Sequence, residues 1–373
     1  MVRTGDHPSV IVVGAGVFGA SVAAVLAERG WAVQILEMSA PGHERSSSHD
    51  ASRLLRMSHG DEDLPDLWYT RSALNSRELW LEIGADEGCD LFVPCGALWL
   101  ARSANGFESR SEKDLAALQI PAERLDPAEA QRFFPDVFYG DLDFLLYEPL
   151  AGVLRARACV STLISRAKRY GAVLRTGRVV PDPAGSRLDG EILMADRVVW
   201  ACGPWLSALF PGLVELRSVK QSVFYFGVEP QWSTPPLPAW LDDGADSYGL
   251  GDLDGSGFKA VHAPPDGGPE IDPDGVERFH EPGSLDRTRQ ILGHRFPPLA
   301  TADLVTARVC QVRIDAGPTF HRGSDRQHSD GLGRGRRLGA RVQARSSPRK
   351  LCCRFAGRPR ATAARFRSQQ EVP

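Results

Sequence analysis

The sequence predicts an α/β fold in which alternating strands and helices are interleaved with an antiparallel sheet. Three observations predict it: a β-branched run followed by apolar residues at helical spacing near the N-terminus, a similar stretch over 152–205, and alternating apolar and polar residues over 218–262. The chain has 373 residues, 42% of them hydrophobic and 24% charged, which is typical of a globular protein long enough for two domains.

The elements can be placed in order along the chain. The segment SVIVVGAGVFGASVAAVLAERGWAVQILE predicts a strand, a glycine turn, a helix that Gly30 ends, and a second strand. Residues 66–83 predict a helix, and 90–102 predict strands around a glycine turn. Residues 152–205 predict a helix and a strand, then a buried strand that ends at a Gly-Pro turn, and 218–262 predict antiparallel strands.

Composition excludes several classes of protein. Residues 1–8 hold no long apolar run, and no segment approaches the roughly 18 apolar residues of a membrane span, so we expect neither a signal peptide nor a membrane protein. Seven cysteines without CxxC spacing argue against a disulfide framework and against a zinc site. We therefore expect a cytoplasmic protein without a metal.

Gly14, Gly16 and Gly19 form the sequence GAGVFG between the first strand and the first helix. The first glycine allows a tight turn, the second lets a pyrophosphate approach the backbone, and the third packs the helix on the strand. Glu37 ends the second strand, where its carboxylate can accept both hydroxyls of a ribose. This context predicts dinucleotide binding and disfavours NADP, because Glu37 would repel a 2′-phosphate.

The stretch SSSHDASRLLR brings two arginines close together. Arg53 and Arg56 are three residues apart, on one side of a turn if the segment is helical, and two guanidiniums beside a cofactor can fix a carboxylate or an anion. Charge alone favours a solvated basic loop. An isolated histidine such as His49 is more often structural than catalytic.

An ordered set of motifs carries a resemblance to a known family. The motifs are GAGVFGASVAAVLAERGWAVQILE, APGHERSSSHDASRLLRMSHGDED, EPLAGVL, DRVVWACGPW, GSGFKAVH and ARVCQ. In this order they resemble the monomeric sarcosine oxidase and N-methyltryptophan oxidase family, which belongs to the D-amino-acid oxidase-like FAD-dependent oxidoreductases. The resemblance runs from about residue 8 to residue 311.

The resemblance implies a Rossmann-like FAD-binding domain interleaved with an α+β substrate domain built on an antiparallel sheet. We expect 8–85 and 150–216, with 305–311, to form the FAD-binding domain, and 86–149 and 217–304 to form the substrate domain. It also implies oxidation of the amine of an amino acid or N-methyl amino acid, with hydride transfer to the flavin and reoxidation by O2 to give H2O2.

Site residues follow from the same resemblance. Gly14, Gly16, Gly19 and Glu37 are expected to hold the ADP part of FAD. Ser52 and Arg53 are expected at the flavin, and Arg56 at the substrate carboxylate. Two further residues are expected to line the FAD, and these are Val180 and Gly203.

Three residues near the end of the resemblance are expected to act in the chemistry. Lys259 matches the lysine that promotes the reaction of the reduced flavin with O2, where a fixed positive charge stabilises the developing superoxide-like charge. His262 lies near the position of the family's active-site histidine. Cys310 matches the cysteine that attaches to the flavin in covalent members, whereas alone it would indicate a small buried hydrophobe.

The resemblance stops abruptly at residue 312. Residues 312–373 hold 15 lysines and arginines against 4 acidic residues and have no apolar periodicity. Shifting the reading frame by one base after the Gln311 codon lets RRLGARVQARSS encode GGSGHGFKHGP, which resembles the expected family segment. We hypothesise that 312–373 are a frameshifted translation; the alternative is an arginine-rich tail that binds RNA or another polyanion.

Alternative functions remain open at this stage. One is a FAD-dependent amino-acid dehydrogenase that uses a quinone, and another is an inactive flavin-binding remnant that results from the altered C-terminus. The substrate pocket is expected among Phe224, Phe226, Trp240 and Tyr248, whose facing the sequence does not give. We expect a monomer that takes an amino-acid-like amine and O2 and binds neither nucleic acid nor membrane.

Overall fold

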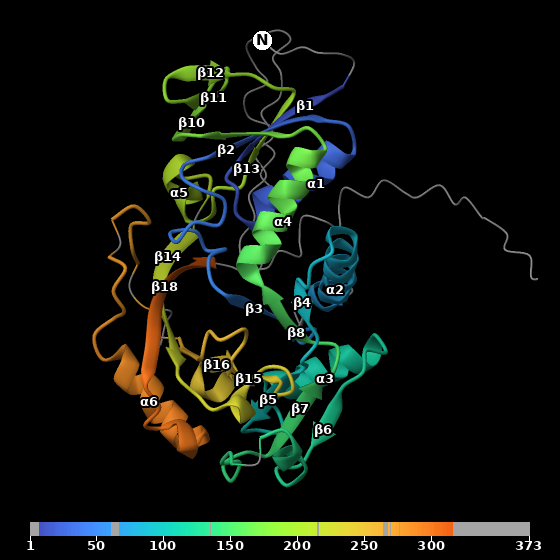
Figure 1. Ribbon diagram of the computed structural model, residues 1–373, viewed down its shortest axis with the longest axis vertical. Coiled ribbons are helices and arrows are strands. Elements are labelled where there is room, and N and C mark those ends of the chain that lie inside the picture. The colour runs from blue at the N-terminus through green and yellow to red at the C-terminus, as the bar shows by residue number, and fades with distance from the viewer. Residues whose placement is uncertain are drawn as a thin grey trace, which may run out of the picture.

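The computed structural model describes residues 7–60, 67–134, 136–214, 216–263, 268, 270–275 and 277–315, with side chains described as far as Gln311. Figure 1 shows a small parallel sheet at one end of the molecule and a larger sheet at the other. Two long strands, β14 (Leu216–Phe226) and β18 (Leu304–Asp315), lie side by side and extend from the larger sheet toward the smaller one.

The parallel sheet is built from the βαβ pattern that the sequence predicts. Its strand order is β13-β1-β2-β9. The strands are β1 (Ser9–Val13), β2 (Ala32–Glu37), β9 (Val173–Thr176) and β13 (Arg197–Trp200). Helices α1 (Val17–Glu28) and α4 (Ala156–Arg169) pack against each other beside this sheet (Figure 1). β1 is buried over Val10–Val13, as expected for a strand covered on both faces.

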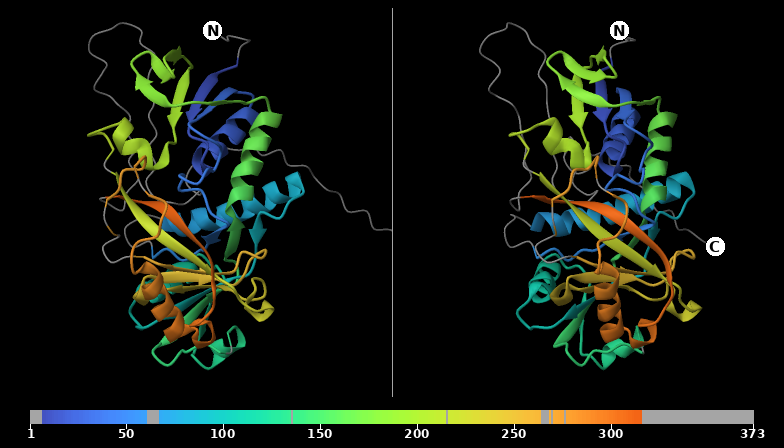
Figure 2. Two further views of the ribbon diagram at one scale, coloured as in Figure 1. Left: turned by 60° about the vertical axis from the view of Figure 1, so that its left-hand side comes forward. Right: turned by 90° about the vertical axis from the view of Figure 1, so that its left-hand side faces the viewer.

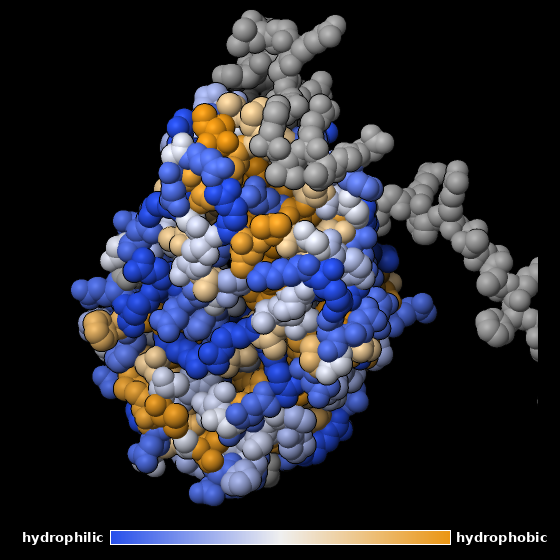
Figure 3. All heavy atoms as spheres, turned by 45° about the horizontal axis from the view of Figure 1, so that its top comes forward, coloured by the Kyte–Doolittle hydropathy of each residue, from blue (hydrophilic) through white to orange (hydrophobic). Residues whose placement is uncertain are grey.

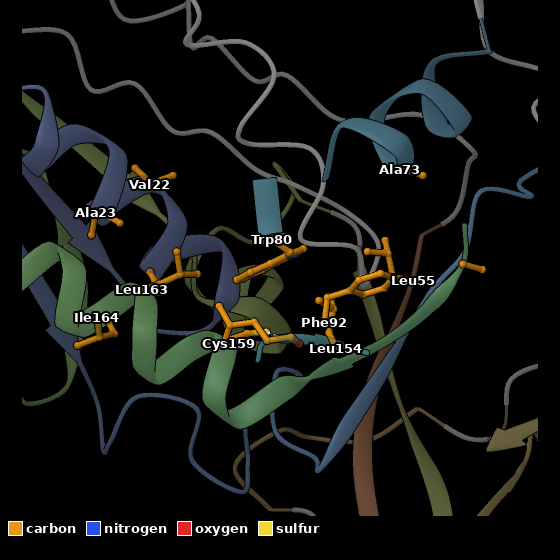
Figure 4. Packing of buried hydrophobic residues seen from close by; sticks show 14 of the residues in the cluster. Val22, Ala23, Leu55, Ala73, Trp80, Phe92, Leu154, Cys159, Leu163 and Ile164 are labelled. Carbon is orange, nitrogen blue, oxygen red and sulfur yellow. Dashed lines mark hydrogen bonds between the residues drawn. The ribbon is translucent and has the colours of Figure 1, made fainter. Parts of the chain in front are cut away.

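The contact between these helices extends into a continuous apolar core. Cys159 and Leu163 are four residues apart on α4 and therefore lie on the same side of that helix. Both belong to one cluster of buried apolar residues with Val22 and Ala23 of α1. Figure 4 shows Trp80 of α2 (Trp68–Glu87) and Leu154, which precedes α4, among the side chains of this core. This core joins the parallel sheet to the rest of the molecule.

The described residues also form two small sheets. The first contains β10 (Val179–Asp182), β11 (Gly185–Leu188) and β12 (Glu191–Leu193), and the short helix α5 (Leu206–Leu209) follows β13. The second has the order β3-β8-β4, and its strands are β3 (Ser52–Leu55), β8 (Gly152–Arg155) and β4 (Phe92–Val93).

The larger sheet has the order β18-β14-β17-β16-β15-β5-β7-β6. Its other strands are β5 (Ala97–Ala101), β6 (Glu123–Leu125), β7 (Phe144–Glu148), β15 (Ala239–Asp242), β16 (Ser247–Leu250) and β17 (Phe258–His262). All neighbours are antiparallel except β15 and β5. The remaining helices are α3 (Phe107–Ala117) and α6 (Ser284–Arg295), and α6 covers part of this sheet (Figure 2).

The two faces of the larger sheet have different partners. Phe224 and Phe258 belong to a cluster with Phe296, which follows α6. Tyr225 and Val261 belong to another cluster, which also contains Cys310. Successive residues of a strand point to opposite faces, so the sheet separates an aromatic core from the side that faces the parallel sheet.

The fold is the predicted mixed α/β architecture, with three differences in detail. The segment that carries Arg53 is strand β3, not a helical turn. Residues 305–311, which we grouped with the FAD-binding segments, lie in β18 of the larger sheet. That strand continues to Asp315, past the predicted boundary at 311, because its backbone pairs with β14 along its whole length. The rest of the predicted tail lies outside the described residues.

The surface seen in Figure 3 is mostly hydrophilic, with apolar side chains showing in patches. Exposed apolar residues include Val180 of β10 and Met194, which follows β12. Among the described residues, no helix combines the length and the apolar composition needed to span a bilayer.

Candidate functional site

One cavity of about 850 Å³ lies where the glycine turn, β3 and the larger sheet meet. Its wall includes residues that are far apart in the sequence, from Gly14 to Asp274. Seven of the residues predicted for the site line this cavity, and these are Gly14, Gly16, Glu37, Arg53, Arg56, Val180 and Gly203. The structure therefore brings the glycine turn and both arginines to a single space.

The glycine turn requires residues without a side chain. Gly14 has a φ of +97°, and a Cβ there would lie 2.5 Å from the carbonyl oxygen of Ala201. A Cβ at Gly19 would overlap the carbonyl oxygen of Gly14, so helix α1 packs directly on the turn. Gly19 itself does not line the cavity. The close approach of Gly19 to Gly14 fits the packing role that the motif predicts for Gly19.

Glu37 ends β2 beside the turn. Its Oε2 accepts a 2.7 Å hydrogen bond from the backbone N–H of Ala15, and its Oε1 accepts one of 3.1 Å from Ser39. Burial alone would raise the pKa of Glu37, but the hydrogen bond with His43 and these two backbone hydrogen bonds outweigh it and lower the pKa. The carboxylate is therefore charged at neutral pH.

The sequence did not identify Ser48 as a partner of helix α1. Its Oγ accepts a 3.0 Å hydrogen bond from the N–H of Val17, the first residue of the helix. Helix N-terminal N–H groups lack partners within the helix, so Ser48 caps one of them from a distant loop. The N-terminal part of the helix borders the cavity through Gly16 and Val17.

Gly203 and Val180 line the cavity from the side of the parallel sheet. Gly203 has a φ of +57°, and a Cβ at this position would meet no atom within 4 Å. Its backbone therefore borders open space rather than packed side chains. Val180 of β10 is 41% exposed although it lies in a strand.

Arg53 is fixed by the loop that precedes it. Its Nη2 donates to the carbonyl oxygens of Ser47 and His49 at 2.9 and 2.8 Å, and its Nη1 lies 3.0 Å from Asp50 Oδ2. These contacts fold the loop around the guanidinium. Arg53 is therefore a fixed positive charge on the cavity wall and not a solvated basic side chain.

Arg56 lies farther along the cavity against two aromatic rings. Its guanidinium carbon is 5.0 Å from the centroid of a Trp99 ring and 5.8 Å from that of Phe107. It also donates to the carbonyl oxygen of Ser58. A guanidinium held on aromatic faces keeps its charge and its planar fork, which suit a carboxylate partner.

Glu148 is a buried carboxylate that sequence reasoning gave no role. It accepts hydrogen bonds from the N–H groups of Met57 and Ser58 at 2.8 and 3.0 Å, from the hydroxyl of Ser58, and from Trp99 Nε1. It therefore fixes both the chain that follows Arg56 and the ring beneath it. An acidic residue at the end of the apolar run FLLYE was the available signal.

Apolar and aromatic side chains form part of the cavity wall. It includes Trp80, Phe107, Leu241 and Tyr248. Tyr248 is the single member of the predicted pocket set Phe224, Phe226, Trp240 and Tyr248 that lines this cavity. The other three belong to the aromatic core on the opposite face of the sheet.

Lys259 lies beneath the cavity wall and does not line it. It is buried, and its Nζ lies 2.6 Å from Asp50 Oδ2, 3.2 Å from Ser52 Oγ and 3.3 Å from the carbonyl oxygen of Ser52. Ser52 is likewise buried and does not line the cavity. Ser52 and Lys259, which were predicted as separate site residues, are thus in contact behind Arg53.

His262 is placed apart from this group. It is three residues from Lys259 in β17, so the two side chains point to opposite faces of the sheet. Its Nδ1 is 3.3 Å from Ser247 Oγ and 3.2 Å from the carbonyl oxygen of Ala245. The structure does not bring His262 to the cavity, because the strand alternation directs it elsewhere.

Cys310 lies in β18 and clusters with Val223, Tyr225 and Val261. It is 8% exposed and does not line the cavity. Cys310 is on the same face of the sheet as Lys259. Its link to a flavin stays a prediction.

The cavity fits an extended dinucleotide such as FAD. Gly14 and Gly203 present bare backbone to it, helix α1 begins at its edge, and the carboxylate of Glu37 borders it. Arg53 lies at the part next to the larger sheet. These residues would hold an anionic pyrophosphate at the glycine turn and a ribose at Glu37.

Comparisons with known proteins agree with this geometry. Residues 9–335 match the family model described as FAD dependent oxidoreductase. The monomeric sarcosine oxidase of Streptomyces avermitilis is 29% identical over 264 residues, which are 67% of this chain and 68% of that protein. The N-methyl-L-tryptophan oxidase of Yersinia pestis is 24% identical over 209 residues, 54% of this chain and 55% of the relative, so the chain spans about half the length of that relative.

A solved structure extends the comparison over more of the chain. The iminodiacetate oxidase of Chelativorans sp. superposes with a TM-score of 0.71 at 24% sequence identity, and the match covers 90% of each chain. At this identity the superposition shows a shared fold.

Proposed function

The chain belongs to the family of FAD-dependent oxidoreductases, and on that premise we propose that it oxidises the amine of an amino acid or N-methyl amino acid. The observation that carries this proposal is the position of Arg56. Its guanidinium lies in the same cavity as the glycine turn and rests on Trp99 and Phe107. A substrate carboxylate bound there would leave the rest of the amino acid inside the cavity.

Bound FAD would supply the two-electron acceptor that takes a hydride from the carbon next to the amine and is reoxidised by O2 to give H2O2. Arg56 would bind the substrate carboxylate through its planar fork. The apolar residues Trp80 and Leu241 would exclude water around the amine, which favours its neutral form. A neutral amine has the lone pair that assists loss of the hydride.

Two cations support an oxidase rather than a dehydrogenase. Arg53 lies on the cavity wall, and Lys259 lies directly behind it in contact with Ser52. Fixed positive charges stabilise the negative charge that develops when electrons pass to O2. We propose that Lys259 has this role and that Cys310 attaches to the flavin.

The assay uses purified protein loaded with FAD, both as printed and with the frame restored after Gln311, a panel of N-methyl and primary amino acids, and parallel measurement of H2O2 and of electron transfer to a quinone. We expect substrate-dependent H2O2 from the frame-restored protein, and we expect Arg56→Met to raise its KM by about 10-fold or more, since a charged hydrogen bond contributes roughly 1.5–3 kcal/mol. Glu112→Gln, which alters a surface ion pair with Arg124, is the control. Quinone reduction without H2O2 would assign the dehydrogenase alternative, and no turnover by flavin-loaded protein would assign the remnant.

We also propose that the protein is a monomer and that it is located in the cytoplasm. Sedimentation of the purified protein and fractionation of cells that produce it are the corresponding measurements.

A further inference from the structure

Asp50 is a buried carboxylate at the junction between the loop before β3 and the larger sheet. It has no exposed surface, and its backbone φ of 150° lies in a region that side chains rarely adopt. No role for Asp50 was predicted from the sequence, although it precedes Ala51 and Ser52 in the stretch SSSHDASRLLR.

Each oxygen of this carboxylate has its own partners. Oδ2 lies 2.6 Å from Lys259 Nζ and 3.0 Å from Arg53 Nη1. Oδ1 accepts a 2.5 Å hydrogen bond from the hydroxyl of Tyr225 and one of 2.7 Å from the N–H of Ala51. Asp50 therefore joins the loop to strands β14 and β17.

The charges around this carboxylate are unequal. Three cations face it, because Arg308 Nη1 also lies 3.5 Å from Oδ1. The titratable and charged groups around Lys259 come from the loop and from β3, β14, β16 and β18. They are Asp50, Arg53, Tyr225, Tyr248, Arg308 and Cys310. Asp50 is the one carboxylate among them.

The ammonium group of Lys259 donates its hydrogen bonds to the end of this loop and to the first residue of β3. An ammonium has three donors, and the three acceptors within 3.3 Å of Nζ belong to Asp50 and Ser52. Of these acceptors, the Asp50 carboxylate alone is charged. The position of the ammonium and its charge therefore depend on the same residue.

We propose that Asp50 is a positioning residue that holds Lys259 in place beneath the cavity and keeps its amine charged. This inference rests on the proposed function for the role of Lys259 but not for the contact itself. Asp50 does not line the cavity, whereas its partner Arg53 does, and its other partner Lys259 lies behind that wall.

The direction of each effect follows from burial and charge. Burial lowers the pKa of Lys259 and Arg53 lowers it further, whereas Asp50 raises it. Burial alone would raise the pKa of Asp50, but Lys259 and Arg53 outweigh it and hold that pKa well below its usual range. Without the carboxylate, the influences that remove charge from Lys259 are left largely unopposed.

The chain allows a direct measurement of this charge. It contains five lysines, at positions 113, 168, 220, 259 and 350, so a protein labelled with ¹³C at the lysine ε-carbon gives few NMR signals. Lys259→Met identifies the signal of interest in the FAD-loaded protein. We expect Asp50→Asn to lower the titration midpoint of that signal by at least about one pH unit, the shift typical of an opposite charge at this distance.

A second measurement connects the charge to the reaction. The rate of flavin reoxidation by O2 should fall with rising pH as Lys259 loses its proton, and Asp50→Asn should move this fall to lower pH by the same amount. If the NMR shift occurs while reoxidation is independent of Lys259, the inference on Asp50 stands and the proposed role of Lys259 fails.

Controls separate this effect from general damage. Asp242→Asn removes another buried carboxylate, which pairs with Arg102 and Arg295, and should leave the Lys259 titration unchanged. Asp50→Glu keeps the charge, so its Lys259 midpoint should lie closer to that of the unaltered protein than the midpoint of Asp50→Asn does. An unchanged Lys259 midpoint in Asp50→Asn would overturn the proposal. If Asp50→Asn does not fold, the unaltered protein carries the test, because a neutral Lys259 amine at neutral pH would overturn the proposal.

Discussion

The indole N–H of Trp99 donates a 2.6 Å hydrogen bond to Oε1 of Glu148. The same carboxylate holds the backbone N–H groups of Met57 and Ser58, which follow Arg56. One buried charge thus sets both the ring under the guanidinium and the chain that carries it. This arrangement predicts that Glu148 affects substrate binding without contacting substrate.

Glu148→Gln keeps the size of the side chain and removes its charge. Because hydrogen bonds to charged groups contribute roughly 1.5–3 kcal/mol, we expect the KM for the amine substrate to rise by about 10-fold or more with little change in kcat. Steady-state kinetics with H2O2 detection gives both constants. A lower kcat with an unchanged KM would contradict the positioning role.

Gly19→Ala should prevent correct packing of helix α1. The added methyl group would overlap the carbonyl oxygen of Gly14, so we expect a loss of about 2 kcal/mol or more in the free energy of unfolding, together with weaker FAD binding. Gly293→Ala is the matched control, since its Cβ would meet the Cβ of Ala300 at 3.5 Å and glycine is costly within a helix. Urea unfolding and flavin absorbance are the measurements. Equal stability of the two variants would refute the packing argument.

The lowered pKa of Glu37 predicts a contribution to stability that depends on pH. A carboxyl group whose pKa is lower in the folded state stabilises the protein above its unfolded-state pKa of about 4.3, and the contribution is lost as pH falls through the folded-state value. The difference in unfolding free energy between the unaltered protein and Glu37→Gln should therefore shrink below about pH 4. Urea unfolding of the flavin-free protein from pH 7 to pH 3 measures it. A difference that grows toward low pH would oppose this assignment.

Cys310→Ser tests the covalent link. In the unaltered protein, acid precipitation should leave the yellow flavin with the pellet, whereas the variant should release it into the supernatant. The thiol is small and buried, and serine has a similar volume, so the variant should stay folded. Cys95→Ser, which alters another buried cysteine outside this cluster, is the control. Flavin release by the unaltered protein would disprove the link.

The frameshift of residues 312–373 stays a prediction, and the family match continues to residue 335. Sequencing the locus should reveal one stray base after the Gln311 codon. The chain with the frame restored should bind flavin and oxidise amines, and the chain as printed should show little amine oxidase activity. Equal activity of the two proteins, or a continuous frame in the locus, would reject the hypothesis.

Sequence reasoning could place the glycine turn and the arginine stretch because their signals are local. Asp50 and Glu148 were missed because their partners are remote, with Asp50 and Lys259 separated by 209 residues. The facing of Tyr248 and Trp240 was also not predictable. All five residues of β5 (Ala97–Ala101) are buried, for example, so an apolar strand covered on both sides carries no pattern that tells one face from the other.

Substitutions on the two faces of the larger sheet should change different properties of this protein. Along β14 to β17, neighbouring residues alternate between the side that carries Lys259 and the aromatic packing beneath. A mutant library that varies only the positions on the Lys259 face would therefore change the activity while the aromatic core stays intact. A library that varies only the positions in the aromatic core would change the thermal stability while the cavity keeps its lining residues.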